Sequence, residues 1–306
     1  MAIEKQEGKR IPISWKDIDC NELFSCSPPE VLYHYTNLDG AAGIIQNASF
    51  WLTKFTYLND KTELHHAIRL FQSEVRQYVV ELDNKELKQF LNKASEQLEC
   101  FEETNLCIGC FCENGDLLSQ WRAYGCSGSG MALGFNSKRL DSFKSTKSIH
   151  LWKCVYAWAQ QVRIIKGLVQ VLVNSFNVIL KGKDGNDNWE KTKRDLIGYF
   201  NSTFLMVAPV LKNAHFQEEQ EWRLITSSLS CDNKSYCVKI SSERVSQYYN
   251  LCFCINEEQK KDFIRNVVVG PSDKASLIAD AFGTLLYQHK YLFDGIGYSQ
   301  IPFRSS

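Results

Sequence analysis

The sequence predicts an α+β fold in which a mixed β-sheet forms the core and helices are inserted between its strands. Short apolar segments typical of strands recur along the chain from residue 31 onward, and segments with helical spacing of apolar residues lie between them. No linker rich in proline, glycine or serine divides the 306 residues, a length near the upper limit for one hydrophobic core. We therefore predict a lead-in over residues 1–30 and one domain over residues 31–306, with helical insertions at about 61–103 and 160–212.

The first half of the chain alternates predicted strands with predicted helices. The strands are Val31–Thr36, Phe50–Phe55, Leu106–Cys112, Met131–Phe135 and Leu151–Tyr156. The first predicted helix begins after a cap at Asn37 or Asp39 and ends at Gln46, and the second begins after a cap at Asp60. Two more helices follow, from Asn84 to about Phe101 and from Asp116 to Tyr124. Asn and Asp suit the caps because their side chains accept hydrogen bonds from the free N–H groups of a first helical turn.

The second half follows the same pattern. Two long helices are predicted over residues 160–181 and 187–212, separated by a turn. The predicted strands are Glu219–Thr226, Tyr236–Ile240 and Val267–Val269, followed by a helix from Asp273 to Gln288 and a closing strand near Tyr298–Pro302. Strands therefore occur on both sides of each helical insertion, as expected for one mixed sheet.

Composition excludes some classes of protein. The 35 basic and 35 acidic residues give no net charge, which argues against a surface that is a nucleic-acid footprint throughout but leaves room for a local basic patch. The first residues, MAIEKQEGKR, lack the apolar region of a secretory leader, and no apolar run approaches the 18 residues of a membrane span. We therefore expect a cytoplasmic protein.

Twelve cysteines raise the question of a metal site. Cys107, Cys110 and Cys112 lie in the segment LCIGCFC, which is predicted to be a strand, so Cys107 and Cys110 face opposite sides and do not converge on one ion. Cys252 and Cys254 lack a partner pair at a zinc-finger spacing. We expect free thiols that pack as small apolar groups, and no metal.

The first motif with side chains suited to binding or catalysis is Tyr33-His34-Tyr35-Thr36. On a strand, His34 and Thr36 point the same way, about 6.6 Å apart, and an imidazole beside a hydroxyl can grip a ribose diol. Tyr35 belongs to the same candidate group, and the N-terminus of the following helix can hold a phosphate. The structural alternative is a core histidine that is hydrogen-bonded beside a threonine favoured in strands.

A second motif follows the second strand and contains Tyr57, Asn59, Asp60 and Glu63. Tyr57 can stack on a flat ring, and Asn59 joins it as a candidate for cofactor binding. For Asp60 and Glu63 the preferred interpretation is structural, because a cap residue followed three positions later by glutamate forms a capping box.

The third motif is Glu219-Gln220-Glu221-Trp222-Arg223. If the strand begins at Glu219, then Glu219, Glu221 and Arg223 share one face. Two neighbouring carboxylates raise one pKa, whereas an arginine beside them lowers both. Such a carboxylate can bind a ribose hydroxyl and stabilise positive charge at the anomeric carbon. The structural alternative, an ion pair between Glu221 and Arg223 on an edge strand, is weighed equally.

Two further features have mainly structural interpretations. Trp121 and Tyr124 share a helical face in the segment DLLSQWRAY and are expected to pack in the core, with Arg122 as a candidate phosphate contact. The predicted loop Asn136–Lys153 carries five basic residues and the single acid Asp141. Its basic residues are Lys138, Arg139, Lys144, Lys147 and Lys153. A solvated loop is the default, and docking of an acidic partner through Lys138, Arg139, Lys144 and Lys147 is the functional alternative.

These motifs together resemble the bacterial family called domain of unknown function 2971. The resemblance runs through LYHYT, YLND-x-x-E, DLLSQWRAY, G-x-x-LGF, EEQEWRL, VVVGP and SQIPFR in this order, from Val31 almost to the end of the chain. Where the family usually has Ser-Phe-Ser after the third strand, this chain has Cys110-Phe111-Cys112. That departure also argues against a requirement for these cysteines as ligands.

A more distant resemblance concerns the H–Y–E layout of ADP-ribosyltransferases. It implies that His34 and Thr36 hold the nicotinamide-side ribose of NAD, that Tyr57 stacks on nicotinamide, and that Glu221 stabilises the oxocarbenium-like transition state. Glu219 is then the first acid of an E-x-E pair. The fold implied is ADP-ribosyltransferase-like, with NAD as substrate and no metal.

The sequence thus leads to one functional hypothesis and two rivals. The hypothesis is transfer of ADP-ribose from NAD to a protein or nucleic-acid acceptor, in a bacterial toxin or phage-defence effector. This reaction needs positioning and charge stabilisation more than a strong base. The first rival is a metal-dependent hydrolase or nuclease, and the second is a non-catalytic nucleotide-binding sensor. The candidate metal ligands of the first rival are His34, Asp60, Glu63, Glu219 and Glu221.

Overall fold

The computed structural model describes residues 26–58, 62–98, 104–125, 130–147, 149–183, 188–240, 245–253 and 257–302. These residues form two compact units, a sheet unit and a helical unit. The sheet unit draws on Leu23–Lys61, Thr104–Tyr156 and Lys212–Ser306, and the helical unit includes Thr62–Glu103 and Ala157–Leu211. Whether the chain counts as one domain with insertions stays a prediction.

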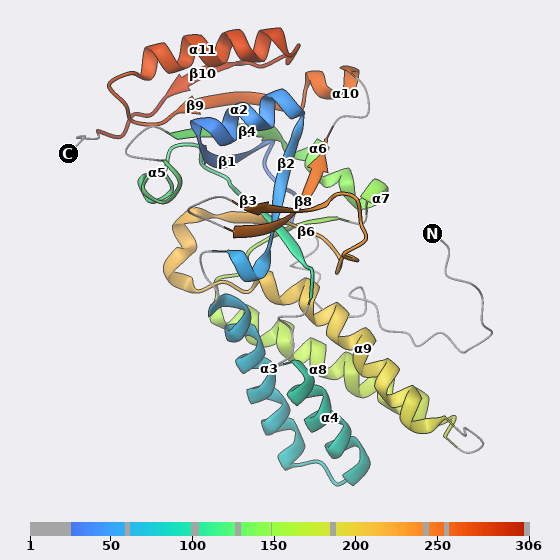
Figure 1. The fold of residues 1–306 in the computed structure, drawn as a ribbon. Helices are drawn as coiled ribbons and strands as arrows, with labels where there is room; N and C mark the ends of the chain where they lie inside the picture. The colour runs from blue at the N-terminus through green and yellow to red at the C-terminus, as the bar shows by residue number, and fades with distance from the viewer. Residues whose placement is uncertain are drawn as a thin grey trace. The chain divides into compact units, whose positions relative to one another are not determined.

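The sheet unit contains a mixed, ten-stranded β-sheet. Its strands are β1 (Val31–Asn37), β2 (Ser49–Lys54), β3 (Cys107–Cys112), β4 (Gly130–Asn136), β5 (His150–Lys153), β6 (Glu221–Ile225), β7 (Tyr236–Ile240), β8 (Val245–Cys252), β9 (Ile264–Val269) and β10 (Gly295–Tyr298). Eight of them follow the order β10-β9-β4-β1-β3-β2-β8-β7, while β6 pairs with β3 and β5 (Figure 1). The α+β fold class with a mixed sheet is therefore confirmed, because β10 pairs with β9 in parallel and the other pairs are antiparallel.

Helices cover the two faces of the sheet around β1. The helices of this unit are α2 (Leu38–Asn47), η2 (Phe55–Tyr57), α5 (Leu118–Tyr124), α6 (Ser137–Asp141), α7 (Phe143–Lys147), η5 (Ala214–Glu219), α10 (Glu257–Lys261) and α11 (Ala275–Gln288). On one face, α2 and α11 pack Ile45 and Phe282 into the main core with Leu32 and Phe111. On the other face, α5 packs Trp121 against Tyr35, Cys112 and Ala132. Alternation along β1 explains the division, since Leu32 and Tyr35 point to opposite faces.

One edge of β3 is shared by two strands that then diverge. Cys112 pairs with Tyr33 of β1, whereas Cys107 and Ile108 pair with Lys54 and Thr53 of β2. The opposite edge of β3 pairs with β6 along residues 108–112. Two arms of the sheet, β1-β4-β9-β10 and β2-β8-β7, therefore leave β3 from the same edge.

The helical unit is built from two helix hairpins, α3–α4 and α8–α9, which are joined by aromatic packing (Figure 1). Its helices are α3 (Thr62–Val80), α4 (Lys85–Gln97), α8 (Trp158–Leu180), α9 (Trp189–Val207) and the short η4 (Ala208–Val210). Phe71 of α3 contacts Phe200 and Phe204 of α9 at ring-centroid distances of 5.1 and 5.5 Å. Phe90 of α4 lies 4.6 Å from Phe176 of α8 by the same measure. Asn84 caps α4 by accepting from the N–H groups of residues 86 and 87, as its position in the sequence predicts.

One described helix, α8, is long and apolar enough to cross a membrane by length and composition alone. Half of its most apolar window is buried inside the protein, which is also the pattern of a core helix. The length and composition of α8 are therefore only weak evidence for a membrane span.

Two segments differ from the sequence-based expectations. The basic segment 136–153 was predicted as a loop that runs into a strand at Leu151, but its described residues up to Lys147 form α6, whose cap is Asn136, and α7. The strand predicted from Leu151 is present as β5, which begins one residue earlier, at His150. Strand β8 was not predicted, because VSQYYNLC lacks a clean alternation of apolar and polar residues.

Candidate functional site

Four charged side chains gather at the start of β6. Lys212 donates to carboxylate oxygens of both Glu219 and Glu221, and its Nζ lies 2.5 Å from Glu221 Oε2. Arg223 makes a bidentate contact with Glu221, in which Nε donates to Oε1 at 3.1 Å and a terminal nitrogen donates to Oε2 at 2.9 Å. We refer to Lys212, Glu219, Glu221 and Arg223 as the carboxylate cluster.

The local sequence explains how the two glutamates meet. Asn213 caps η5 by accepting from the N–H of His215, and Gln220 adopts a left-handed φ of 41° that turns the chain from η5 into β6. The strand therefore begins at Glu221, and the prediction that Glu219 lies on it is wrong. The turn nevertheless leaves both carboxylates in contact with Lys212, so the predicted pairing of Glu219 and Glu221 is present by a different route.

The ion pair between Glu221 and Arg223 is buried. Strand β6 is an interior strand between β3 and β5, and the side chains of Glu221 and Arg223 are both 4% exposed. The edge-strand alternative is therefore wrong about the location of the pair, although it is right that the pair forms. A buried pair matters more to stability, because removal of one partner leaves a charge without water or a counter-ion.

The two carboxylates have opposite pKa shifts. Burial alone would raise the pKa of Glu221, but the charges of Arg223 and Lys212 outweigh it and hold the pKa at about 2. Burial raises the pKa of Glu219 and outweighs its contact with Lys212. Glu219 also reaches further toward solvent, with 15% of its side chain exposed. Glu221 is thus held in its ionised form, whereas Glu219 keeps its proton to a higher pH than an ordinary glutamate.

Hydroxyl and thiol groups surround the cluster. Tyr156 accepts a hydrogen bond from the backbone N–H of Glu221 at 2.9 Å, and the thiol of Cys154 lies 3.7 Å from Glu221 Oε2. Tyr124 of α5 is 41% exposed, and burial together with the charges of Cys110 and Glu221 raises the pKa of its hydroxyl. Burial and Glu221 raise the pKa of the Cys110 thiol as well. Tyr124 and Cys110 therefore keep their protons beside an ionised carboxylate.

The strand register separates His34 from this cluster. Tyr33, Cys112 and Glu221 lie in one cross-strand row and share a face of the sheet, so His34 and Thr36 point to the opposite face. Two strand spacings, about 10 Å, separate β1 from β6. This register therefore does not place His34 and Glu221 in a single cleft.

His34 instead fills the gap where β1 and β2 diverge along β3. Its Nδ1–H donates to the carbonyl oxygen of Cys110 at 2.9 Å, and its ring lies 5.7 Å from that of Phe111. Burial lowers the pKa of His34, which keeps the imidazole neutral. These contacts match the structural alternative for the motif.

The other members of the first motif have defined surroundings. The hydroxyl of Tyr35 donates to the carbonyl of Asn114 at 2.9 Å and accepts from the N–H of Leu117 at 3.0 Å, so it anchors the segment that leads into α5. Thr36 is half-buried beside Gly40, where a Cβ would lie 2.1 Å from its hydroxyl oxygen. Asn37 caps α2 by accepting from Gly40 N–H at 2.8 Å.

Tyr57 lies at the far end of β3 from the carboxylate cluster. Phe55, which begins η2, donates its N–H to Leu106 just before β3, whereas Glu221 pairs with Cys112 at the other end. Five residues of strand, roughly 16 Å, separate these ends. The structure does not bring Tyr57 and Glu221 together. Asn59 and Asp60 lie outside the described residues.

The remaining candidates lie on α5 to α7. Arg122 is exposed on α5. Arg139 makes a bidentate contact with Asp262 at 3.0 and 3.1 Å, and Lys147 donates to the carbonyl of Cys252 at 2.7 Å. Lys153 pairs with Glu113 at 2.6 Å, while Lys138 and Lys144 are exposed. The basic segment is therefore an ordered part of the sheet unit.

The described residues hold no group of three or more His, Cys, Asp or Glu side chains placed to bind a metal ion. The eight cysteines in the described part of the chain are free thiols. In the cluster itself, the oxygens of Glu221 already face two cations, so a divalent ion would have to displace them.

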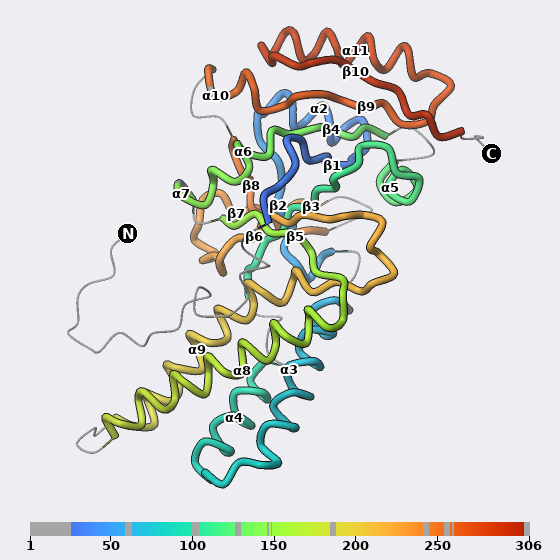
Figure 2. The backbone as a smooth tube through the Cα atoms, turned by 180° about the vertical axis from the view of Figure 1, so that it is seen from behind, coloured from blue at the N-terminus to red at the C-terminus, as the bar shows by residue number. Residues whose placement is uncertain are grey.

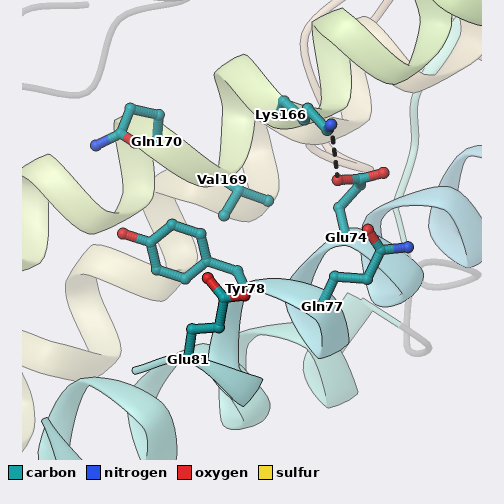
Figure 3. Close-up of a pocket in the computed structure, with 7 residues that line it drawn as sticks. All are labelled: Glu74, Gln77, Tyr78, Glu81, Lys166, Val169 and Gln170. Carbon is teal, nitrogen blue, oxygen red and sulfur yellow. Dashed lines mark ion pairs between the residues drawn. The ribbon is translucent and has the colours of Figure 1, made fainter. Parts of the chain in front are cut away.

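The helical unit contains a groove between α3 and α8 (Figure 3). Its lining residues are Glu74, Gln77, Tyr78, Glu81, Lys166, Val169 and Gln170. Glu74 and Lys166 pair across it at 4.0 Å, and none of the predicted site residues lines it. We therefore centre the candidate site on the carboxylate cluster.

Sequence reasoning missed Lys212, Tyr124 and Tyr156 as members of the site. Lys212 lies nine positions before Glu221, at the end of a predicted helix, where a lysine is expected to be solvated. Tyr124 was expected in the core with Trp121, but only Trp121 is buried. The signal available for Tyr124 was a tyrosine at the last position of a helix, where its hydroxyl can reach solvent while Trp121 is buried.

A family model described as a protein of unknown function (DUF2971) matches residues 120–224, about a third of the chain. This match supports the resemblance to that family over the segment from α5 to β6. The matched segment contains Tyr124, Tyr156 and the whole carboxylate cluster. No curated protein matches the chain, and no solved structure matches it.

Proposed function

We propose that the carboxylate cluster transfers ADP-ribose from NAD to a protein or nucleic-acid acceptor. The observation that supports this proposal best is that Glu219 and Glu221 share Lys212 while Arg223 contacts Glu221. Despite burial, these charges lower the pKa of Glu221, whereas burial raises the pKa of Glu219. Pairs of carboxyl groups whose environments separate their pKa values are typical of acid–base and glycosidic chemistry. A bacterial toxin or phage-defence effector acting in the cytoplasm is the biological setting that we propose.

Each carboxylate has a separate role in the proposed reaction. The bond between the anomeric carbon and the nicotinamide nitrogen breaks, its electron pair leaves with the nitrogen, and positive charge develops on the ribose. Glu221 faces this charge in an ionised form that Arg223 and Lys212 have fixed in advance, so no proton must leave it during the step. The acceptor atom bonds to the anomeric carbon and passes its proton to Glu219.

The aromatic neighbour in this proposal is Tyr124. Its ring is partly exposed, and the charges of Glu221 and Glu219 act on its hydroxyl, which supports a role in stacking on nicotinamide. Tyr57, the aromatic residue implied by the H–Y–E resemblance, lies at the other end of β3. His34 and Thr36 face away from the cluster, so in this proposal they support strand β1 and do not contact NAD.

The two rival functions make different predictions for the same cluster. A metal-dependent hydrolase needs an ion among its carboxylates, where Lys212 and Arg223 now provide the positive charge. A non-catalytic sensor keeps the nucleotide contacts but turns over no NAD.

The test is incubation of the purified protein with cell extract and NAD labelled in the adenylate part, with and without a chelator. The proposal expects label on a macromolecular acceptor, unaffected by the chelator. Metal-dependent release of cleavage products into solution, with no label on a macromolecular acceptor, would favour the hydrolase rival. NAD binding without labelling or nicotinamide release would favour the sensor.

A further inference from the structure

An exposed aromatic pair lies on the arm of the sheet formed by β2, β8 and β7. Trp51 of β2 stacks on Tyr248 of β8, with ring centroids 4.1 Å apart and planes inclined by 25°. Nζ of Lys239, on β7, lies 5.0 Å from the centroid of the Trp51 ring. We refer to Trp51, Tyr248 and Lys239 as the aromatic platform. Trp51 is 45% exposed, so part of its ring meets solvent although Tyr248 and Lys239 contact it.

The described side chains that share the sheet face of the platform are uncharged or basic. The pairing of β2 with β8 and of β8 with β7 identifies the side chains that share this face. They are Ser49, Trp51, Thr53, Ser246, Tyr248, Asn250, Cys252, Cys237 and Lys239. None of these described residues is acidic, so they do not repel an anion.

The basic segment meets the same arm of the sheet. Lys147 of α7 donates to the carbonyl of Cys252, the last residue of β8, at 2.7 Å. The ribbon view and the tube view both place α7 near β8 (Figures 1 and 2). Four residues of strand, about 13 Å, separate Cys252 from Tyr248. Lys144, one helical turn before Lys147, extends the positive charge at this end.

We infer that the aromatic platform and α7 together bind single-stranded nucleic acid. A stacked aromatic pair offers its flat face to a nucleobase, and nearby lysines meet the phosphates, which is the general arrangement of single-strand binding surfaces. A base takes the place of the Lys239 ammonium over the indole, and the ammonium then faces the adjacent phosphate. An acidic polypeptide uses the lysines but has no flat group for Trp51, so the platform favours nucleic acid. This surface is separate from the proposed NAD chemistry and needs no turnover.

The test measures binding of labelled oligothymidine and oligouridine to the full chain by fluorescence anisotropy, without NAD. We expect binding that weakens with salt, quenching of tryptophan fluorescence, and weaker binding to duplex DNA. Trp51→Ala should reduce affinity roughly five- to hundredfold, the usual contribution of one stacked base, and Trp51→Phe should restore most of it. Trp158→Ala, which removes another exposed tryptophan, is the matched control and should leave binding unchanged.

A second pair of variants tests the basic part of the surface. Lys144→Gln and Lys239→Gln should each weaken all sequences equally and reduce the salt dependence by about one phosphate contact. Absence of binding to either oligonucleotide would overturn the inference. Binding that Trp51→Ala does not affect, or polyglutamate that competes as well as oligothymidine, would also overturn it, because the lysines alone would then account for the interaction.

Discussion

The replacement Glu221→Gln tests whether Glu221 is a catalytic group or only a partner of Arg223. Gln has nearly the same size as Glu, so the packing of the neighbouring Trp222 is retained. The change removes one negative charge from a buried group in which Lys212 and Arg223 are balanced by Glu219 and Glu221. Two buried cations then share one carboxylate, which faces Lys212.

The structure changes the expected cost of this substitution. An exposed ion pair would contribute under about 1 kcal/mol, whereas breaking a buried pair costs about 3–5 kcal/mol. We therefore expect Glu221→Gln to lower the free energy of unfolding by about 3 kcal/mol, whether or not Glu221 is catalytic. Loss of a preorganised charge at the reacting centre costs a further hundred- to thousandfold in rate, on the order of 3–4 kcal/mol.

Stability and rate must therefore be measured on the same sample. NAD consumption is followed well below the melting temperature, and the rate is divided by the folded fraction from circular dichroism. Glu113→Gln is the matched control, because the carboxylate of Glu113 likewise accepts hydrogen bonds from two side chains, those of Lys153 and Trp222. It should destabilise the protein and leave the rate per folded molecule unchanged. A Glu221→Gln protein that melts early and turns over NAD at the wild-type rate would refute the catalytic role.

Three further predictions follow from the site and its supports. Because the pKa of Glu221 is lowered from 4.5 to about 2, its contribution to stability, about 3 kcal/mol, is complete above about pH 4.5 and is lost as the pH falls through 2; acid titration of the melting temperature should show a smaller slope there in Glu221→Gln. Tyr124→Ala should raise the KM for NAD several-fold because the stacked ring is lost, whereas Tyr124→Phe should keep the KM near the wild-type value. Steady-state kinetics measures both, and equal effects of the two substitutions would exclude a stacking role. Asp116 accepts hydrogen bonds from Trp121, Ser299 and Gln300 and so joins α5 to the C-terminal segment. Asp116→Ala should lower the free energy of unfolding in denaturant by about 2–3 kcal/mol and should also raise the KM, because Tyr124 is displaced. An unchanged denaturation midpoint would show that this anchor is dispensable.

Much of the fold was predictable because periodicity is a local property. The apolar segments around Leu32, Phe111 and Leu133 form strands where they were expected, and the long helical stretches form helices with ends within a few residues. Glu219 was placed wrongly on a strand, because a single left-handed residue, Gln220, ends η5 immediately before β6. Nothing in the local pattern of Glu219-Gln220-Glu221 indicates that turn.

The arrangement of the candidate site depends on register, which the sequence does not determine. Alternation predicts that Glu221 and Arg223 share a face, and they do. It cannot predict that Tyr33, and not His34, lies in the row of Glu221, because one residue of register reverses the face of every side chain on a strand. Lys212 joins the cluster from outside any strand, so only the folded chain reveals it.

The most direct test of the proposed function is release of nicotinamide from NAD by the purified protein. The account predicts that nicotinamide appears in proportion to the NAD consumed, that a chelator has no effect, and that Glu221→Gln releases at least a hundredfold less per folded molecule. NAD that stays intact with the wild-type protein, both alone and with cell extract as a source of acceptors, would contradict the central claim and leave the carboxylate cluster as a buried ion-pair network.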